Sequence, residues 1–128
     1  MHRYTAKVRW SELDPYAHLN HAVYLTMCET ARIDLLDQIG WGVEDVDLWE
    51  VNEAFAVVPM AFMQEMSVPH EKLNVNGGAC ALGHPIGASG TRIIVTLLNA
   101  LGEQGKTHGM ASLCHGTGGG TALAVERL

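Results

Sequence analysis

Apolar and polar residues follow two different periods along the first forty positions of the chain. Residues 4–11 alternate strictly, which predicts a half-buried β-strand. Between Asn20 and Ile39 the apolar residues recur at helical spacing, which predicts an amphipathic helix that Gly40 ends. The pattern therefore opens with one strand followed by one helix.

From residue 43 onward, short apolar runs alternate with longer segments of helical period. Strands are predicted at residues 46–51, 73–75, 110–114 and 121–127. A first helix is predicted over residues 53–66, with Pro59 as a kink or an early stop. A second helix begins after residue 88, ends near Gly105 and buries one apolar stripe: Ile94, Leu97, Leu98 and Leu101. The fold class is α/β, a layered sheet with parallel segments that a terminal hairpin closes at a tight turn over residues 116–120.

Composition narrows the class of protein. Of the 128 residues, 48% are hydrophobic and 17% are charged, which is typical of a soluble globular domain. The net charge is −6 and the basic residues are scattered, so we expect neither nucleic acid nor a membrane as a partner. Three cysteines without a Cys-x-x-Cys pair, and no apolar signal segment at the start, predict a cytoplasmic location.

Residues 74–90 are the most distinctive stretch of the sequence. Five glycines and Pro85 surround the single histidine of this stretch, His84, and the small residues that follow open a helix. Glycines let a backbone approach another group closely, and the free N–H groups at a helix start favour negative charge. We interpret this stretch as a catalytic loop in preference to a buried turn.

Other motifs point less clearly to chemistry. The glycines at 116–120 lead into a strand, so they do not form a dinucleotide fingerprint, and the sequence contains no phosphate-binding P-loop. No ligand pair has zinc-finger spacing, so we expect no metal. Cys28 and Cys80 are expected to be small buried residues, and His70 and His108 are expected at the surface or in loops.

Three ordered blocks resemble the thiolases, the acyl-CoA C-acyltransferases. They are Asn-Glu-Ala-Phe-Ala at residues 52–56, the histidine loop, and Cys-His-Gly-Thr-Gly-Gly-Gly at residues 114–120. The resemblance covers about residues 42–128 and implies an incomplete, layered α/β C-terminal domain of that family. It also implies that a carbon–carbon bond is formed or cleaved between acyl-CoA molecules, with a coenzyme A thioester as the substrate and no further cofactor.

The resemblance assigns roles to four residues. Cys114 would be the acid/base that moves a proton at the acyl α-carbon, which a thiol with a lowered pKa can do. The N–H of Gly116 would contribute to an oxyanion hole. His84 would donate to the other thioester oxygen and assist the nucleophile, and Asn52 would fix the water that completes that hole.

The opening segment resembles a different family. Residues 4–39 resemble the start of a hotdog-fold acyl-CoA thioesterase of the hydroxybenzoyl-CoA type. The motif at residues 10–24 carries this resemblance, and Asp14 matches the catalytic aspartate of that family. We therefore divide the chain into residues 1–41, a strand and helix of hotdog type, and residues 42–128. Asp14 and His18 are also explained as turn and cap residues between a strand and a helix, and we favour that interpretation.

One catalytic part has no counterpart in the sequence. The nucleophilic cysteine of thiolases lies in their N-terminal half, and Cys28 lies on an apolar helical stripe that would not activate it. The chain alone is therefore expected to be inactive, and to self-associate or to pair with a second chain that carries the missing half. A non-catalytic truncated or fused α/β fragment and a hotdog thioesterase using Asp14 remain the alternatives.

Overall fold

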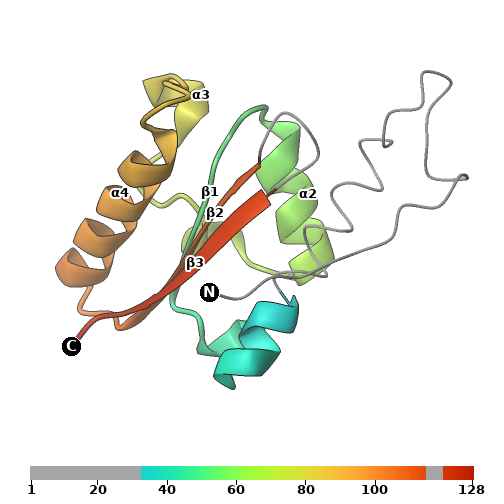
Figure 1. Ribbon diagram of the computed structural model, residues 1–128, viewed down its shortest axis with the longest axis vertical. Coiled ribbons are helices and arrows are strands. Elements are labelled where there is room, and N and C mark those ends of the chain that lie inside the picture. The colour runs from blue at the N-terminus through green and yellow to red at the C-terminus, as the bar shows by residue number, and fades with distance from the viewer. Residues whose placement is uncertain (1–32, 115–119) are drawn as a thin grey trace, which may run out of the picture.

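The computed structural model describes residues 33–114 and 120–128 (Figure 1). Its sheet contains three strands in the order β1-β2-β3: β1 (Leu48–Val51), β2 (His108–Cys114) and β3 (Gly120–Glu126). β1 pairs with β2 in parallel, Leu48 opposite Gly109, and β2 pairs with β3 in antiparallel fashion. The predicted parallel segment and the terminal hairpin are thus confirmed.

Helices cover both faces of this sheet, α4 (Ser89–Glu103) on one side and α2 (Val57–Met66) on the other (Figure 1). The short helix α3 (Ala79–Leu82) lies near the start of α4, and two 3₁₀ turns occupy Val43–Asp45 and His70–Lys72. Residues 33–39 are helical, and Gly40, with φ +74°, follows them as expected. The N–H of Trp41 then donates to the carbonyl of Leu36 at 3.0 Å, which closes the helix end.

Each face of the sheet has its own apolar core, because successive residues of β1 point to opposite sides. Trp49 and Val51 pack with Phe62 and Met66 of α2. On the other face, Leu48 packs with residues of α4 and β2: Ile93, Leu97, Ala100, Leu101 and Ala111. Both faces of β1 are therefore buried in the layered α/β architecture.

Several details differ from the sequence-based expectation. Pro59 lies in the first turn of α2, where its missing N–H has no intrahelical partner to lose, so it neither kinks nor stops the helix. Leu98 is 44% exposed, because the buried stripe of α4 runs through Ile93 and Ala100 instead. The predicted strand at residues 4–11 lies outside the described residues. The predicted strand at residues 121–127 corresponds to β3.

The predicted strand at residues 73–75 is reduced to a single bridge between Leu73 and Trp49. Asn74 has φ +47°, which turns the backbone away from the sheet. The carboxamide of Asn74 takes the place of the backbone hydrogen bonds that a strand would make to β1. Its Oδ1 accepts from the Val51 N–H at 2.8 Å, and its Nδ2 donates to the Val51 carbonyl at 2.9 Å. A side chain thus pairs with the edge of β1 where backbone was expected.

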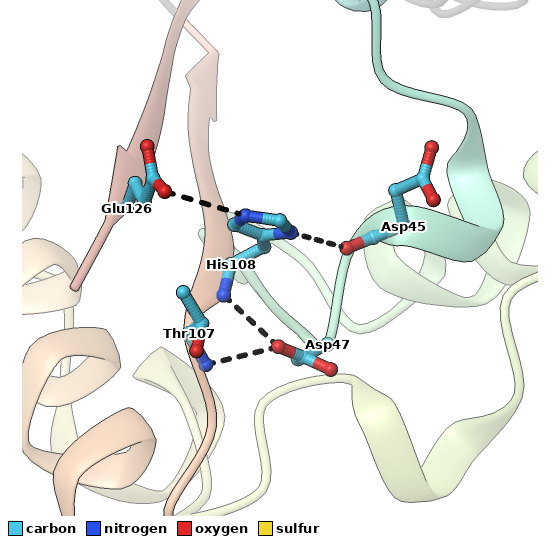
Figure 2. A network of polar contacts seen from close by, with 5 residues as sticks. All are labelled: Asp45, Asp47, Thr107, His108 and Glu126. Carbon is cyan, nitrogen blue, oxygen red and sulfur yellow. Dashed lines mark hydrogen bonds and ion pairs between the residues drawn. The ribbon is translucent and has the colours of Figure 1, made fainter. Parts of the chain in front are cut away.

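A polar network fixes the opposite end of the sheet, where β1 and β2 begin (Figure 2). Asp47 accepts from the N–H groups of Thr107 at 3.0 Å and His108 at 2.9 Å, and these bonds hold the pKa of its carboxyl below the usual value. His108 Nδ1 lies 3.0 Å from the Asp45 carbonyl and Nε2 lies 3.9 Å from a Glu126 oxygen. His108, expected at the surface or in a loop, is therefore the half-buried first residue of β2.

Within residues 33–114 and 120–128, no helix combines the length and apolar character that crossing a bilayer requires. The same ranges contain no group of three or more His, Cys, Asp or Glu side chains arranged to hold a metal ion.

Candidate active site

The site lies at the end of the sheet where the parallel strands β1 and β2 both finish. Asn52 follows β1 directly, and its N–H donates to the Ser112 carbonyl of β2 at 2.9 Å. Cys114 is the last residue of β2 and is half-buried. Parallel strands bring their carboxyl ends to one edge, so the fold places the segments of Asn52 and Cys114 side by side.

The histidine loop reaches the same edge through the start of α4. Ser89, fully buried, is the first residue of that helix, and a Cβ on its neighbour Gly90 would lie 3.5 Å from the Leu113 side chain. Leu113 directly precedes Cys114. The helix start that carries the loop therefore packs against the strand end that carries the cysteine, as the predicted gathering of these motifs requires.

Ser89 also fixes the imidazole of His84. The Ser89 hydroxyl lies 2.6 Å from His84 Nδ1 and donates to the Pro85 carbonyl at 3.1 Å. A hydroxyl has one proton, so in the tautomer with hydrogen on Nδ1 the ring donates to Ser89 while Ser89 donates to Pro85. The neutral ring then carries its free lone pair on Nε2, and His84 can accept a proton at that atom.

Glu53 ties the exit of β1 to the start of α3. One carboxylate oxygen accepts from the Asn74 amide and the other from the Cys80 N–H, each at 2.9 Å. Burial, the largest effect, would raise the pKa of Glu53, but hydrogen bonds from Cys80 and Asn74 outweigh it and leave that pKa lowered. A Cβ at Gly78 would lie 2.3 Å from the Glu53 Cδ, so a larger residue there would push the carboxylate off its donors.

Cys80 is exposed, so the expectation of a buried thiol is wrong at this position. Desolvation and the neighbouring Glu53 carboxylate raise the pKa of the Cys80 thiol. A raised pKa leaves less thiolate near neutrality, which makes this cysteine a poor nucleophile.

A small cavity opens between β1, α3 and α4 next to Asn52. The residues that line it are Glu50, Val51, Asn52, Glu53, Gly77, Gly78, Ala79, Leu82, Arg92, Ile93 and Thr96. Asn52 is 2% exposed, and neither amide atom has a hydrogen-bond partner in the part of the chain that the structure describes. Such a buried amide needs a partner, which fits a residue that binds water or a ligand.

Sequence reasoning named Asn52, His84 and Cys114, and the structure gathers their segments at one edge of the sheet. The sequence analysis missed Glu50, Glu53 and Asn74, because their polar contacts leave no periodic pattern in the sequence. Gly116 and Asp14 lie outside the described residues, so their predicted roles stay predictions.

Comparison with known proteins gives consistent matches. A family model described as the thiolase C-terminal domain matches residues 15–127. An acetyl-CoA acetyltransferase of Synechocystis sp. is 59% identical over 99 residues, which is 77% of this chain and 25% of that protein. The cytosolic acetyl-CoA acetyltransferase of Mus musculus is 57% identical over 88 residues, 69% of this chain and 22% of that protein.

A solved structure agrees with these relatives. The crystal structure of the Bacillus anthracis acetyl-CoA acetyltransferase matches with a TM-score of 0.69 and 48% sequence identity, over 73% of this chain and 24% of that one. The chain thus spans about a quarter of the length of the relatives it matches. None of these matches supports the thioesterase resemblance of residues 4–39, and the family match itself begins at residue 15.

Proposed function

Because the chain belongs to the thiolase family, through its C-terminal domain, we propose that it is the C-terminal portion of a thiolase-type acyltransferase acting on coenzyme A thioesters. The relatives named acetyl-CoA acetyltransferase favour acetyl-CoA as the acyl donor. The observation that carries the proposal is the convergence of Asn52, the His84 loop and the end of β2 at one edge of the sheet.

In this proposal Cys114 is the acid/base at the α-carbon of the acyl group. Its half-buried position at the end of β2 is compatible with access to a substrate. The adjacent His115 and the glycines that follow in the sequence favour a thiolate by charge and by backbone N–H groups. Gly116, without a side chain, would leave its N–H free to bind the thioester oxygen of the transition state.

His84 would act in two stages. With Nδ1 donating to Ser89, the neutral ring accepts a proton from the nucleophilic thiol at Nε2. The resulting imidazolium then has an N–H at Nε2 that donates to the thioester oxygen. The Asn52 amide, buried and unpartnered among the described residues, would hold a water that donates to the same oxygen.

The proposed reaction needs a nucleophilic cysteine from elsewhere. The pKa of Cys80 is raised, and Cys28, outside the described residues, is predicted on an apolar helical stripe that would not activate it. We therefore propose that the chain acts with a second chain that carries the N-terminal part of the family, or self-associates. A cytoplasmic location is part of the same proposal, since cytosolic relatives exist.

Two measurements on the chain test this function. In the first, a panel of acyl-CoA substrates is incubated with the chain, with and without coenzyme A. We expect no turnover, because no acyl-enzyme can form. Hydrolysis that is lost in Asp14→Asn would instead support the thioesterase alternative, and acylation of Cys80 or Cys28 during turnover would refute the half-site argument.

The second measurement is alkylation across pH with peptide mapping. We expect Cys114 to be modified at lower pH than Cys28 and Cys80, and Cys114→Ser to remove that reactivity. The matched control is Cys80→Ser, which should leave the pH profile of Cys114 unchanged. If Cys114 reacts no faster than the other cysteines, the chain is better described as a non-catalytic α/β fragment.

A further inference from the structure

Glu50 is a carboxylic acid buried in the layer between β1 and α4. It lies in the middle of β1, and its side chain points to the same face as Leu48 and Asn52, because residues two apart share a face. Only 3% of Glu50 is exposed, and its Oε1 atom has no hydrogen-bond partner among the described residues. A buried carboxyl with an unpartnered oxygen costs stability, so its presence at this position calls for a function.

The charged groups that face Glu50 do not neutralise it. Arg92 of α4 is the attractive one, but its guanidinium donates to the carbonyls of Gly83 at 2.6 Å and Leu82 at 3.4 Å. Glu53, at the exit of β1, is the repulsive one. Burial first, and then the Glu53 charge, raise the pKa of Glu50 to about 7 against the opposing effect of Arg92. Glu50 therefore exchanges its proton near neutrality.

Asn52 lines the same cavity and also lacks hydrogen-bond partners. Both atoms of its amide are buried without partners in the described part of the chain. The cavity has a volume of about 10 Å³, at the lower bound for a single water molecule, and it offers such a water polar partners on two sides. One water between Glu50 and Asn52 would give a partner to Glu50 Oε1 and to one of the two amide atoms of Asn52.

We propose that Glu50 is a positioning residue that holds Asn52 through one buried water, and that the proton on Glu50 sets which amide atom of Asn52 faces this water. A water has two hydrogens and two lone pairs, so it can bond to either amide atom in both states of Glu50, and the charge decides between them. An ionised Glu50 attracts the positive Nδ2 end of the amide and repels Oδ1, so the water donates to Glu50 and accepts from Asn52 Nδ2. Protonation of Glu50 removes this preference. The inference rests on the proposed function in one respect only: that Asn52 orients the water at the thioester.

The test is side-chain amide NMR of the whole chain, without substrate. We expect the Asn52 Nδ2 resonances to shift from about pH 5 to about pH 9, with a midpoint near 7. The shift should vanish in Glu50→Gln, which keeps the shape but cannot ionise. It should persist in the control Glu65→Gln, on the exposed face of α2.

Constant Asn52 resonances across this range in the unmodified chain would overturn the proposal, as would a titration that survives Glu50→Gln. The unmodified chain decides the question even if Glu50→Gln folds poorly. The readout involves neither Cys114 nor turnover, so its failure leaves the proposed function standing, and loss of Cys114 reactivity leaves the Glu50–Asn52 coupling standing.

Discussion

The pairing of the Asn74 carboxamide with β1 gives the sharpest prediction about stability. Asn74→Gly removes the side chain but keeps a residue that tolerates the φ of +47°, so it isolates the lost hydrogen bonds from backbone strain. Val51 is buried, and the substitution leaves its N–H and C=O without their partners. Glu53 loses one of its two donors as well.

The magnitude follows from these three contacts. An orphaned backbone group in a partly buried setting costs about 1 kcal/mol, and a lost hydrogen bond to a charged group costs about 1.5 kcal/mol. The total is about 3.5 kcal/mol, a large share of the about 5–15 kcal/mol that stabilises a typical domain. With a urea m-value of about 1.5 kcal/mol/M, the unfolding midpoint should fall by about 2 M.

Urea titration followed by far-UV circular dichroism and by the fluorescence of buried Trp49 measures this loss. Asn99→Gly is the matched control, because Asn99 only bonds back to the Val95 carbonyl on the exposed side of α4. Its cost should stay below about 1 kcal/mol. Equal midpoints for the two variants would refute the claim that the Asn74 amide replaces a strand.

Three further predictions concern other parts of the fold. Gly109→Ala should lower the free energy of unfolding measured in urea by about 1–3 kcal/mol, because the new Cβ would lie 2.9 Å from two leucine methyl groups. Gly102→Ala is the control: the nearest atom to its Cβ lies at 4.0 Å, so the substitution should be neutral or stabilising. Asp47 has a lowered pKa in the folded state, so its carboxylate stabilises the fold above its unfolded pKa of about 4, and this effect is lost as the pH falls. Asp47→Asn should therefore unfold at lower urea than the unmodified chain at neutral pH, and the two midpoints should converge in acid. Glu53→Gln should lower the pKa of Cys80 and speed its alkylation near neutral pH, as measured by peptide mapping; an unchanged rate would contradict the assigned cause.

The sequence predicted the elements whose apolar residues are periodic. The strands β1 and β2 and the helix α4 contribute more than half of the buried apolar residues, and their patterns reflect that burial directly. The strand β3 was predicted as well, although its residues are exposed or only partly buried. The buried stripe of α4 was displaced by one position at Leu98, since periodicity defines a face only to within about one residue. The glycine-rich loop and the end of β2 were also predicted to carry the site.

The parts that were missed depend on side-chain contacts across long sequence separations. Asn74 looks like a strand residue until its positive φ and its bonds to Val51 are seen. Glu50 looks like the polar position of a half-exposed strand, and only the packing of α4 over β1 makes it buried. The Ser89 partner of His84, five residues further on, gave no signal because serine is common at helix starts.

The parallel pairing of the sheet also determines when β1 is completed during synthesis. Each residue of β1 pairs with a residue 61 positions further along, such as Leu48 with Gly109 and Val51 with Ser112. At a translation rate of about 5–20 residues per second, β1 leaves the ribosome about 3–12 s before its partner strand does. Loop closure over this distance cannot begin earlier, however strong the final contacts are. The time that Trp49 and Val51 spend without a partner strand is therefore set by the ribosome, and chaperones have that interval in which to bind them.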